Sequence, residues 1–197
     1  MRFKNFDDFV FENEKEKGSK HSYGCVMLGF TYPDMNEIHE MIKPDDVYTE
    51  EDDEGNKKKG LEKEPHVTLL YGLHSDEIND SDIKNVCFEY EFDTMKLKDV
   101  SIFENDDFDV LKFDVEGNSL NECNSRLSEF PFTTDFPEYH PHATIAYLTK
   151  GSGSKYVTAV KERMKSKLKE GLDVVPTTII YSKPSGDKHR WDIAVNI

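Results

Sequence analysis

The amino-acid sequence predicts an α+β protein built mainly from antiparallel strands. The seven-residue string from Pro65 to Tyr71 recurs in part from Pro141 to Tyr147, with proline, histidine, threonine and tyrosine at matching positions. Both copies alternate polar and apolar side chains, the pattern of a half-buried strand. Each copy is followed by helical or loop material and then by further strands. The chain therefore shows a crude internal duplication.

Composition indicates one compact unit inside the cell. The 197 residues are enough to bury a core without cross-links. A formal charge of −15 opposes binding along a nucleic-acid duplex. Three widely spaced cysteines suggest neither a disulfide framework nor a thiolate zinc site. Without a long apolar stretch or a secretory segment, we expect a cytoplasmic monomer that does not contact membranes.

The N-terminal third begins with a leader. Residues 1–21 join a short Phe-rich amphipathic segment to a charged run, and we expect a flexible leader followed by one domain over residues 22–197. Whether the leader packs on the domain or is a detachable address stays open. Residues 22–30 are predicted to be a buried strand and residues 34–42 a short helix. The charged residues 44–64 lack an apolar period and predict a solvated loop.

The rest of the chain contains strand candidates and two helices. After the first copy of the string, strands are predicted over residues 86–92, 95–103 and 108–115. A helix capped by Asn118 is predicted to run to Pro131, because its apolar residues are spaced by three, four and three. A second helix spans residues 154–170, with Gly171 at the C-cap position. Residues 174–181 and 191–197 are predicted as closing strands.

The repeated string presents one imidazole and one hydroxyl on the same face of each strand. Side chains alternate along a strand, so His66 and Thr68 share a face, and so do His142 and Thr144. If the two strands face each other across a cleft, they supply a general base, a general acid and two hydrogen-bond donors.

Paired His-x-Thr strands about 76 positions apart resemble those of the 2H phosphoesterase superfamily. The resemblance extends from residue 22 to residue 197. Within the superfamily, residues 23–28 and 60–66 resemble phage-encoded versions, among them the anti-CBASS nucleases that degrade cyclic oligonucleotide signals of bacterial immunity. The resemblance implies a bilobal pseudo-symmetric fold, in which two antiparallel sheets surround a central cleft and the helices lie outside.

The resemblance also implies catalytic roles for His66, Thr68, His142 and Thr144. A neutral imidazole can take a proton while an imidazolium returns one, so no metal or other cofactor is required. The threonine hydroxyls can donate to the non-bridging phosphate oxygens. Which histidine is the base is left open by the near symmetry of the two motifs.

Substrate binding is predicted to involve Tyr23, Lys183, Lys188 and Trp191. The segment 182–191 contains cations for phosphates and the only tryptophan of the chain, and it is either a lid over the cleft or an ordinary hairpin connection with Trp191 buried. Tyr23 is expected to stack on a base, with a core position as the alternative.

Two further alternatives concern the other tyrosines and histidines. Alternation along the strands turns Tyr71 and Tyr147 away from the cleft, and we expect both in the core. His66, His74 and His140 could in principle bind zinc. No carboxylate stands at an obvious ligand spacing, so we expect no metal.

The function predicted from these features is metal-independent cleavage of 3′–5′ bonds in a cyclic di- or trinucleotide, with the 2′-hydroxyl as nucleophile. Two alternatives remain open. The first is an enzyme that opens 2′,3′-cyclic phosphates at RNA ends. The second is a non-catalytic protein that sequesters nucleotides and retains the histidines as phosphate ligands.

Overall fold

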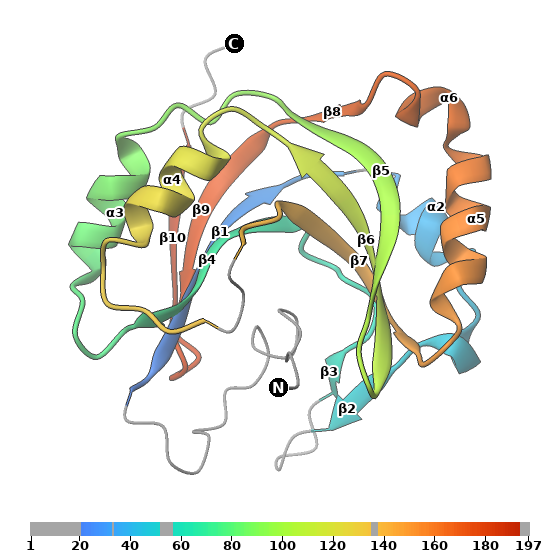
Figure 1. Ribbon diagram of the computed structural model, residues 1–197, viewed down its shortest axis with the longest axis horizontal. Helices are drawn as coiled ribbons and strands as arrows, with labels where there is room; N and C mark the ends of the chain where they lie inside the picture. The colour runs from blue at the N-terminus through green and yellow to red at the C-terminus, as the bar shows by residue number, and fades with distance from the viewer. Residues whose placement is uncertain (1–20, 33, 52–56, 135–137, 194–197) are drawn as a thin grey trace.

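Two four-stranded antiparallel sheets face each other and carry helices on their outer sides (Figure 1). The computed structural model describes residues 21–32, 34–51, 57–134 and 138–193. The predicted leader therefore lies outside the described residues, except for His21. The α+β class and the bilobal two-sheet architecture are as predicted.

Sheet A contains the first strand, the first motif strand and the end of the chain. Its order is β10 (Lys188–Asp192), β9 (Pro176–Ser182), β1 (Tyr23–Phe30) and β4 (His66–His74). Sheet B has the order β7 (His142–Thr149), β6 (Phe108–Glu116), β5 (Met95–Glu104) and β8 (Leu172–Val174). The motif strands β4 and β7 are edge strands of different sheets, and they contact each other.

The helices cover the outer faces of the two sheets. Next to sheet A lie α3 (Asp80–Phe88) and α4 (Leu120–Leu127), and next to sheet B lie α2 (Met35–His39), α5 (Gly153–Arg163) and α6 (Lys165–Leu168) (Figure 1). The two lobes are interleaved in sequence, because α4 follows two strands of sheet B but packs against β4 of sheet A. Neither lobe is a continuous piece of chain.

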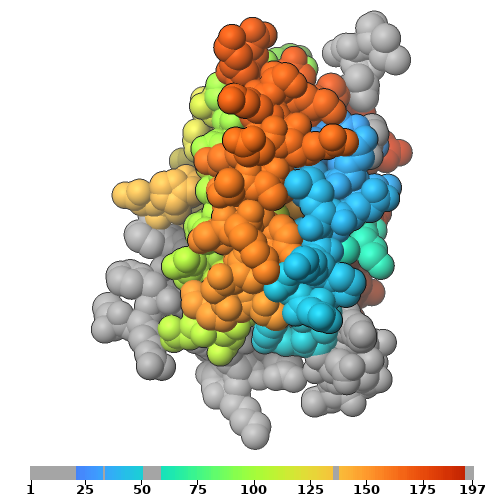
Figure 2. Space-filling view, turned by 90° about the vertical axis from the view of Figure 1, so that its right-hand side faces the viewer, coloured from blue at the N-terminus to red at the C-terminus, as the bar shows by residue number. Residues whose placement is uncertain are grey.

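The outer side of sheet B joins segments that are distant in sequence. Residues 34–50 lie beside α5 and α6 on this face (Figure 2). Asp46 accepts hydrogen bonds from Lys155 at 2.8 Å and from the hydroxyl of Tyr156 at 2.6 Å. Arg163 pairs with Glu37 at 3.2 Å. These contacts hold the segment between β1 and β4 on the opposite lobe.

Residues 86–92 do not form the predicted strand, because α3 occupies positions 80–88. Their alternating apolar residues imitate a strand, yet Ile83, Val86 and Cys87 fall on one helical face and are buried. Phe88, which the alternation would bury, is exposed. Packing of α3 against α4 and β9 therefore decided the structure of this segment.

Residues 44–64 are also more ordered than the predicted loop. They contain the 3₁₀ helix η1 (Pro44–Asp46) and the short paired strands β2 (Thr49–Glu51) and β3 (Lys57–Lys59). Val47 and Leu61 form β-bridges to Leu148 and Ala146 of β7. These residues pair through their backbone with the edge strand β7, and such pairing does not require apolar side chains at regular intervals. The sequence pattern therefore did not indicate this order.

The connection between β9 and β10 is a hairpin turn and not a lid. The amide of Lys183 donates to the carbonyl of Asp187 at 2.9 Å, and the amide of Gly186 donates to that of Lys183 at 3.0 Å. The last strand therefore begins at residue 188, earlier than predicted. The N-cap position of helix α4 is Ser119 and not Asn118, and the Ser119 side chain makes no capping hydrogen bond. The predicted helix over residues 154–170 is divided into α5 and α6.

One large apolar cluster joins both lobes, and each sheet carries a smaller cluster on its other face. We call these two faces, which also carry the motif histidines, the inner faces. On sheet A the small cluster contains Cys25, Met27, Tyr71 and Ile180, and on sheet B it contains Phe108, Val110 and Tyr147. Within the described residues, no helix is long and apolar enough to cross a membrane.

Candidate active site

The two motif histidines occupy the same position in their strands and hold their rings in the same way. His66 begins β4, and its Nδ1 lies 2.7 Å from the carbonyl oxygen of Glu64. His142 begins β7, and its Nδ1 lies 2.9 Å from the carbonyl oxygen of His140. A carbonyl can only accept, so Nδ1 carries the hydrogen in both rings. In a neutral ring, Nε2 then has the lone pair that can accept a proton.

The motif threonines lie two residues further along each strand and are buried. Thr68 faces Met27 across the β1–β4 pair and lies close to the thiol of Cys25. Burial raises the pKa of Cys25 to about 12. The thiol therefore stays protonated at neutral pH, and Cys25 is not a nucleophile.

A shift in register turns Tyr71 toward the inner face, contrary to the prediction. Thr68 pairs with Met27, but the next pair in β1 joins Val26 to Leu70, so one residue of β4 is left over as a bulge. Tyr71 pairs with Cys25 and packs in its cluster. The side chain is buried as expected, but it shares the face of Thr68.

The second motif strand has the same irregularity. Thr144 pairs with Lys112, whereas Ala146 pairs with Leu111, and the shift places Tyr147 opposite Val110. Tyr147 is buried in the inner cluster of sheet B. In both strands a bulge follows the threonine and brings the tyrosine onto the same face as the threonine. The duplication therefore includes the position of the tyrosine.

Lys112 is a buried cation on the inner face of sheet B that the sequence analysis did not select. Its Nζ donates to the hydroxyl of Ser101 at 2.8 Å and to the carboxylate of Asp114, and it lies 4.4 Å from the centre of the Phe103 ring. The strand register places it opposite Thr144. The available indication in the sequence was a lysine between Leu111 and Phe113, in the middle of a predicted strand.

An aromatic pocket of about 170 Å³ opens beside His142. Tyr71 and Thr68 line it from sheet A, Phe103 lines it from sheet B, and Tyr139 lines it from the segment before β7. The ring of Phe103 packs edge-to-face against His142 at 5.1 Å. Because residues from both sheets line this pocket, it is part of the cleft between the lobes.

A second hollow lies near His66 and is more polar. It has a volume of about 580 Å³, and Gly29, Glu64, Ile180 and Arg190 are among the residues that line it. Arg190 donates to the carboxylate of Glu64 at 3.0 Å, and this contact holds the pKa of Glu64 below its ordinary value. Lys188 lies 3.7 Å from the same carboxylate.

The structure brings two of the four predicted substrate-binding residues to the inner face. Lys188 is one, and Tyr23 is the other, with its ring centre 6.5 Å from that of Tyr71. The remaining two lie on the outer face of sheet A. Trp191 pairs with Ile179 and packs against the main core, and Lys183 binds Asp80 of α3 at 2.5 Å.

The three histidines considered for zinc do not come together, since His66 and His74 lie at opposite ends of β4. Among the described residues, the histidines and carboxylates close enough to share an ion are His21, His74 and Glu77. His140 instead is largely exposed and lies 3.5 Å from Glu138.

Comparison with known proteins adds a family and a fold. The family model described as "Anti-CBASS protein Acb1" matches residues 53–174, more than half of the chain, and includes both His-x-Thr motifs. No curated protein sequence matches significantly. The structure of Kluyveromyces marxianus Usb1 is similar with a TM-score of 0.53 and 11% identity, and the similarity covers 88% of this chain and 99% of that one.

The same Usb1 with uridine monophosphate is similar with a TM-score of 0.50 and 10% identity, covering 87% of this chain and 98% of that one. At such low identity these structures support the fold alone. Together with the family match and the paired motifs, they lead to one conclusion: the chain belongs to the anti-CBASS Acb1 family and has the fold of the 2H phosphoesterase superfamily.

Proposed function

We propose that the protein carries out its anti-CBASS role as a metal-independent phosphodiesterase that opens a cyclic di- or trinucleotide. His66 and His142 act as the acid–base pair. The observation that carries this proposal is the matched Nδ1–carbonyl hydrogen bond of the two rings. It orients both Nε2 atoms for proton transfer.

The proposed reaction is an internal transesterification. One neutral histidine removes the proton from a ribose 2′-hydroxyl, and the 2′-oxygen forms a bond to the adjacent phosphorus. The bond from phosphorus to the 5′-oxygen breaks, and the other histidine, as imidazolium, gives that oxygen its proton. The product is a linear oligonucleotide that ends in a 2′,3′-cyclic phosphate. Opening the ring removes the cyclic signal.

Negative charge on the phosphorane oxygens requires fixed donors. Thr68 and Thr144 lie two residues from the histidines and supply hydroxyl groups. The ammonium of Lys112 lies opposite Thr144, held by Ser101 and Asp114, and is a further N–H donor on one side of the site. The lobes are therefore unlike: sheet B has this buried cation, whereas sheet A has Met27 at the position opposite its motif threonine.

The two hollows are suited to the two parts of a small nucleotide. The aromatic pocket beside His142 offers Tyr71, Phe103 and Tyr139 for stacking on one base. Tyr23 continues this aromatic surface on sheet A. Near His66, Lys188 and Arg190 bring positive charge to the cleft. The net charge of −15 disfavours longer polyanions, so a compact cyclic substrate is preferred.

The test compares the ribose and 2′-deoxyribose forms of one cyclic dinucleotide, with substrate in excess over protein. We expect multiple turnovers of the ribose form and no cleavage of the deoxy form. Binding of the deoxy form should remain within a few-fold, because stacking and phosphate contacts persist.

Other outcomes would support the alternatives. Equal cleavage of both forms would exclude attack by the 2′-hydroxyl. Rapid opening of 2′,3′-cyclic phosphates without cleavage of cyclic dinucleotides would identify an enzyme for RNA ends. Stoichiometric binding without turnover of any of these compounds would identify a sequestering protein.

A further inference from the structure

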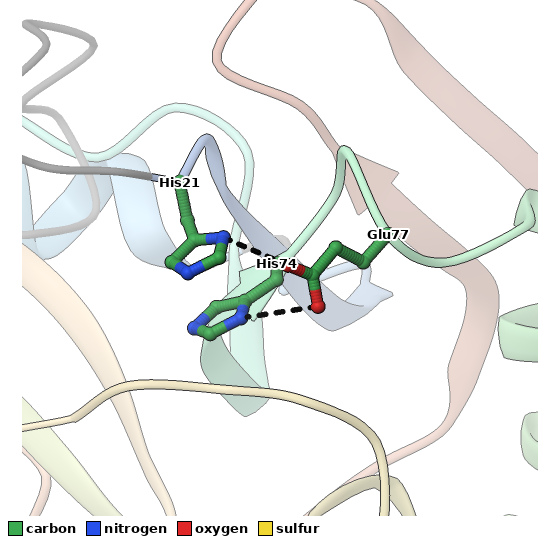
Figure 3. A group of neighbouring side chains, drawn as sticks. All are labelled: His21, His74 and Glu77. Atoms are coloured by element: carbon green, nitrogen blue, oxygen red, sulfur yellow. Dashed lines mark ion pairs between the residues drawn. The ribbon is translucent and has the colours of Figure 1, made fainter.

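Two histidines stack on each other where β1 begins and β4 ends, far from the catalytic pair (Figure 3). The ring centres of His21 and His74 are 3.8 Å apart, and the ring planes differ by 7°. The carboxylate of Glu77 faces both rings: one oxygen lies 3.2 Å from Nδ1 of His21 and the other lies 3.8 Å from Nδ1 of His74. One ring nitrogen of each histidine and a carboxylate oxygen of Glu77 therefore lie within 4.8 Å of one another.

Hydrogen bonds link the segments that carry these ligands. The amide of Ser22 donates to the carboxylate of Asp76 at 3.1 Å, and the amide of Ser75 donates to the carbonyl of Ser22 at 2.8 Å. These two hydrogen bonds join Ser22, the neighbour of His21, to the segment that contains His74 and Glu77, more than fifty residues further along the chain. The backbone segments that carry the three side chains are therefore held together before any ion binds. Since the rings are stacked in parallel, at least one of them must turn about its side-chain bonds for both Nδ1 lone pairs to reach the same ion.

The second ring nitrogen of His74 also has a hydrogen-bond partner, as is usual for histidines that bind a metal through the other nitrogen. Its Nε2 lies 2.9 Å from the hydroxyl of Thr133. When Nε2–H donates to this hydroxyl, Nδ1 presents its lone pair toward Glu77. The second oxygen of the Asp76 carboxylate is 3.6 Å from Nδ1 of His21.

We propose that His21, His74 and Glu77 form a binding site for a divalent transition-metal ion such as Zn²⁺. Imidazole and carboxylate ligands suit this class of ion, whereas Mg²⁺ and Ca²⁺ favour sites made of oxygen alone. The bound ion would link His21, just before β1, to the end of β4 and the turn that follows it. It is a structural site, because His74 is eight residues from His66, roughly 26 Å along an extended strand.

The first experiment measures metal binding by the full chain. The protein is stripped with EDTA, dialysed against Zn²⁺ and assayed for bound metal and for Tm. We expect one tightly bound Zn²⁺ per chain and a Tm that rises with Zn²⁺ concentration. With Co²⁺ in place of Zn²⁺, visible d–d absorption would report nitrogen and oxygen ligation directly.

Variants assign the ion to this site. His21→Ala and Glu77→Gln should each weaken binding more than 100-fold while the circular dichroism spectrum is preserved. Thr133→Val should weaken it about 10- to 100-fold, as expected for loss of the hydrogen-bond partner of His74. His140→Ala is the matched control, because this exposed histidine also lies beside a glutamate but belongs to no three-ligand group among the described residues.

Unchanged Zn²⁺ affinity in folded Glu77→Gln and His21→Ala proteins would overturn the proposal. The same conclusion would follow if the unaltered chain retained no Zn²⁺, or if His140→Ala abolished binding. These measurements do not depend on cleavage activity, so they stand apart from the test of the proposed function.

Discussion

At the scale of single residues, the main expectation concerns His66 and His142. Replacing either with Ala should reduce turnover by about 10²- to 10⁴-fold, because a general acid or base is lost while the partner histidine remains. Steady-state cleavage of the cyclic substrate measures this effect. His189→Ala, on the outer face of sheet A and paired with Asp80, should retain normal activity. Near-normal turnover in a folded His66→Ala or His142→Ala protein would contradict the assignment.

At the scale of elements, Gly72 determines how closely the segment before the aromatic pocket approaches β4. Its φ is +90°, and a Cβ at this position would overlap the carbonyl group of Thr133, whose amide donates to the Gly72 carbonyl at 2.9 Å. We expect Gly72→Ala to lower the free energy of unfolding by more than about 1 kcal/mol and to weaken substrate binding. Urea titration and equilibrium binding measure the two effects.

Gly151→Ala is the control for this substitution. Gly151 has a φ of +82° and nothing within 4 Å of an added Cβ. Alanine at this position therefore introduces the strain of a positive φ without a steric clash. If both alanine variants lose the same stability and bind substrate equally well, the close contact with Thr133 is unimportant.

Helix α2 is joined to the second motif strand through His39. Its Nε2–H donates to the carbonyl of Ile145 at 3.0 Å. Burial lowers the pKa of His39 below its ordinary 6.5, since the charged form loses hydration. The stabilising contribution is therefore present above pH 6.5 and is lost as the pH falls through the folded pKa, because the unfolded chain takes up a proton first.

Urea titrations between pH 5 and 7.5 test this contribution. The stability of the unaltered chain should fall toward acid pH, and His39→Gln should show a smaller fall, because its amide can donate to Ile145 without titrating. The same slope in both proteins would show that other groups control the pH dependence.

At the scale of the whole molecule, catalysis and the proposed metal site should respond differently to a chelator. Excess EDTA should leave the cleavage rate unchanged, and the pH–rate profile should be bell-shaped, as expected for one catalytic base and one catalytic acid. If the metal site exists, the same EDTA treatment lowers Tm. Loss of cleavage that returns on adding Zn²⁺ would refute metal-independent chemistry.

The chain crosses between lobes several times, and this determines which predictions the sequence could support. The repeated string lies within seven residues, so alternation along one strand was sufficient to place His66 and Thr68 on one face. The same local rule failed for Tyr71, because a bulge depends on how the neighbouring strand aligns. It also failed for residues 86–92, since α3 is stabilised by α4 and β9.

The sequence by itself determined the fold class, the strong strands and helices and the two His-x-Thr pairs, because periodicity and local repetition encode these features. Only the tertiary structure decided that Lys112 lies opposite Thr144, that Trp191 and Lys183 occupy the outer face, and that His21 stacks on His74. Each of these outcomes depends on strand order and register between segments distant in sequence. No local pattern of side chains specifies those long-range pairings.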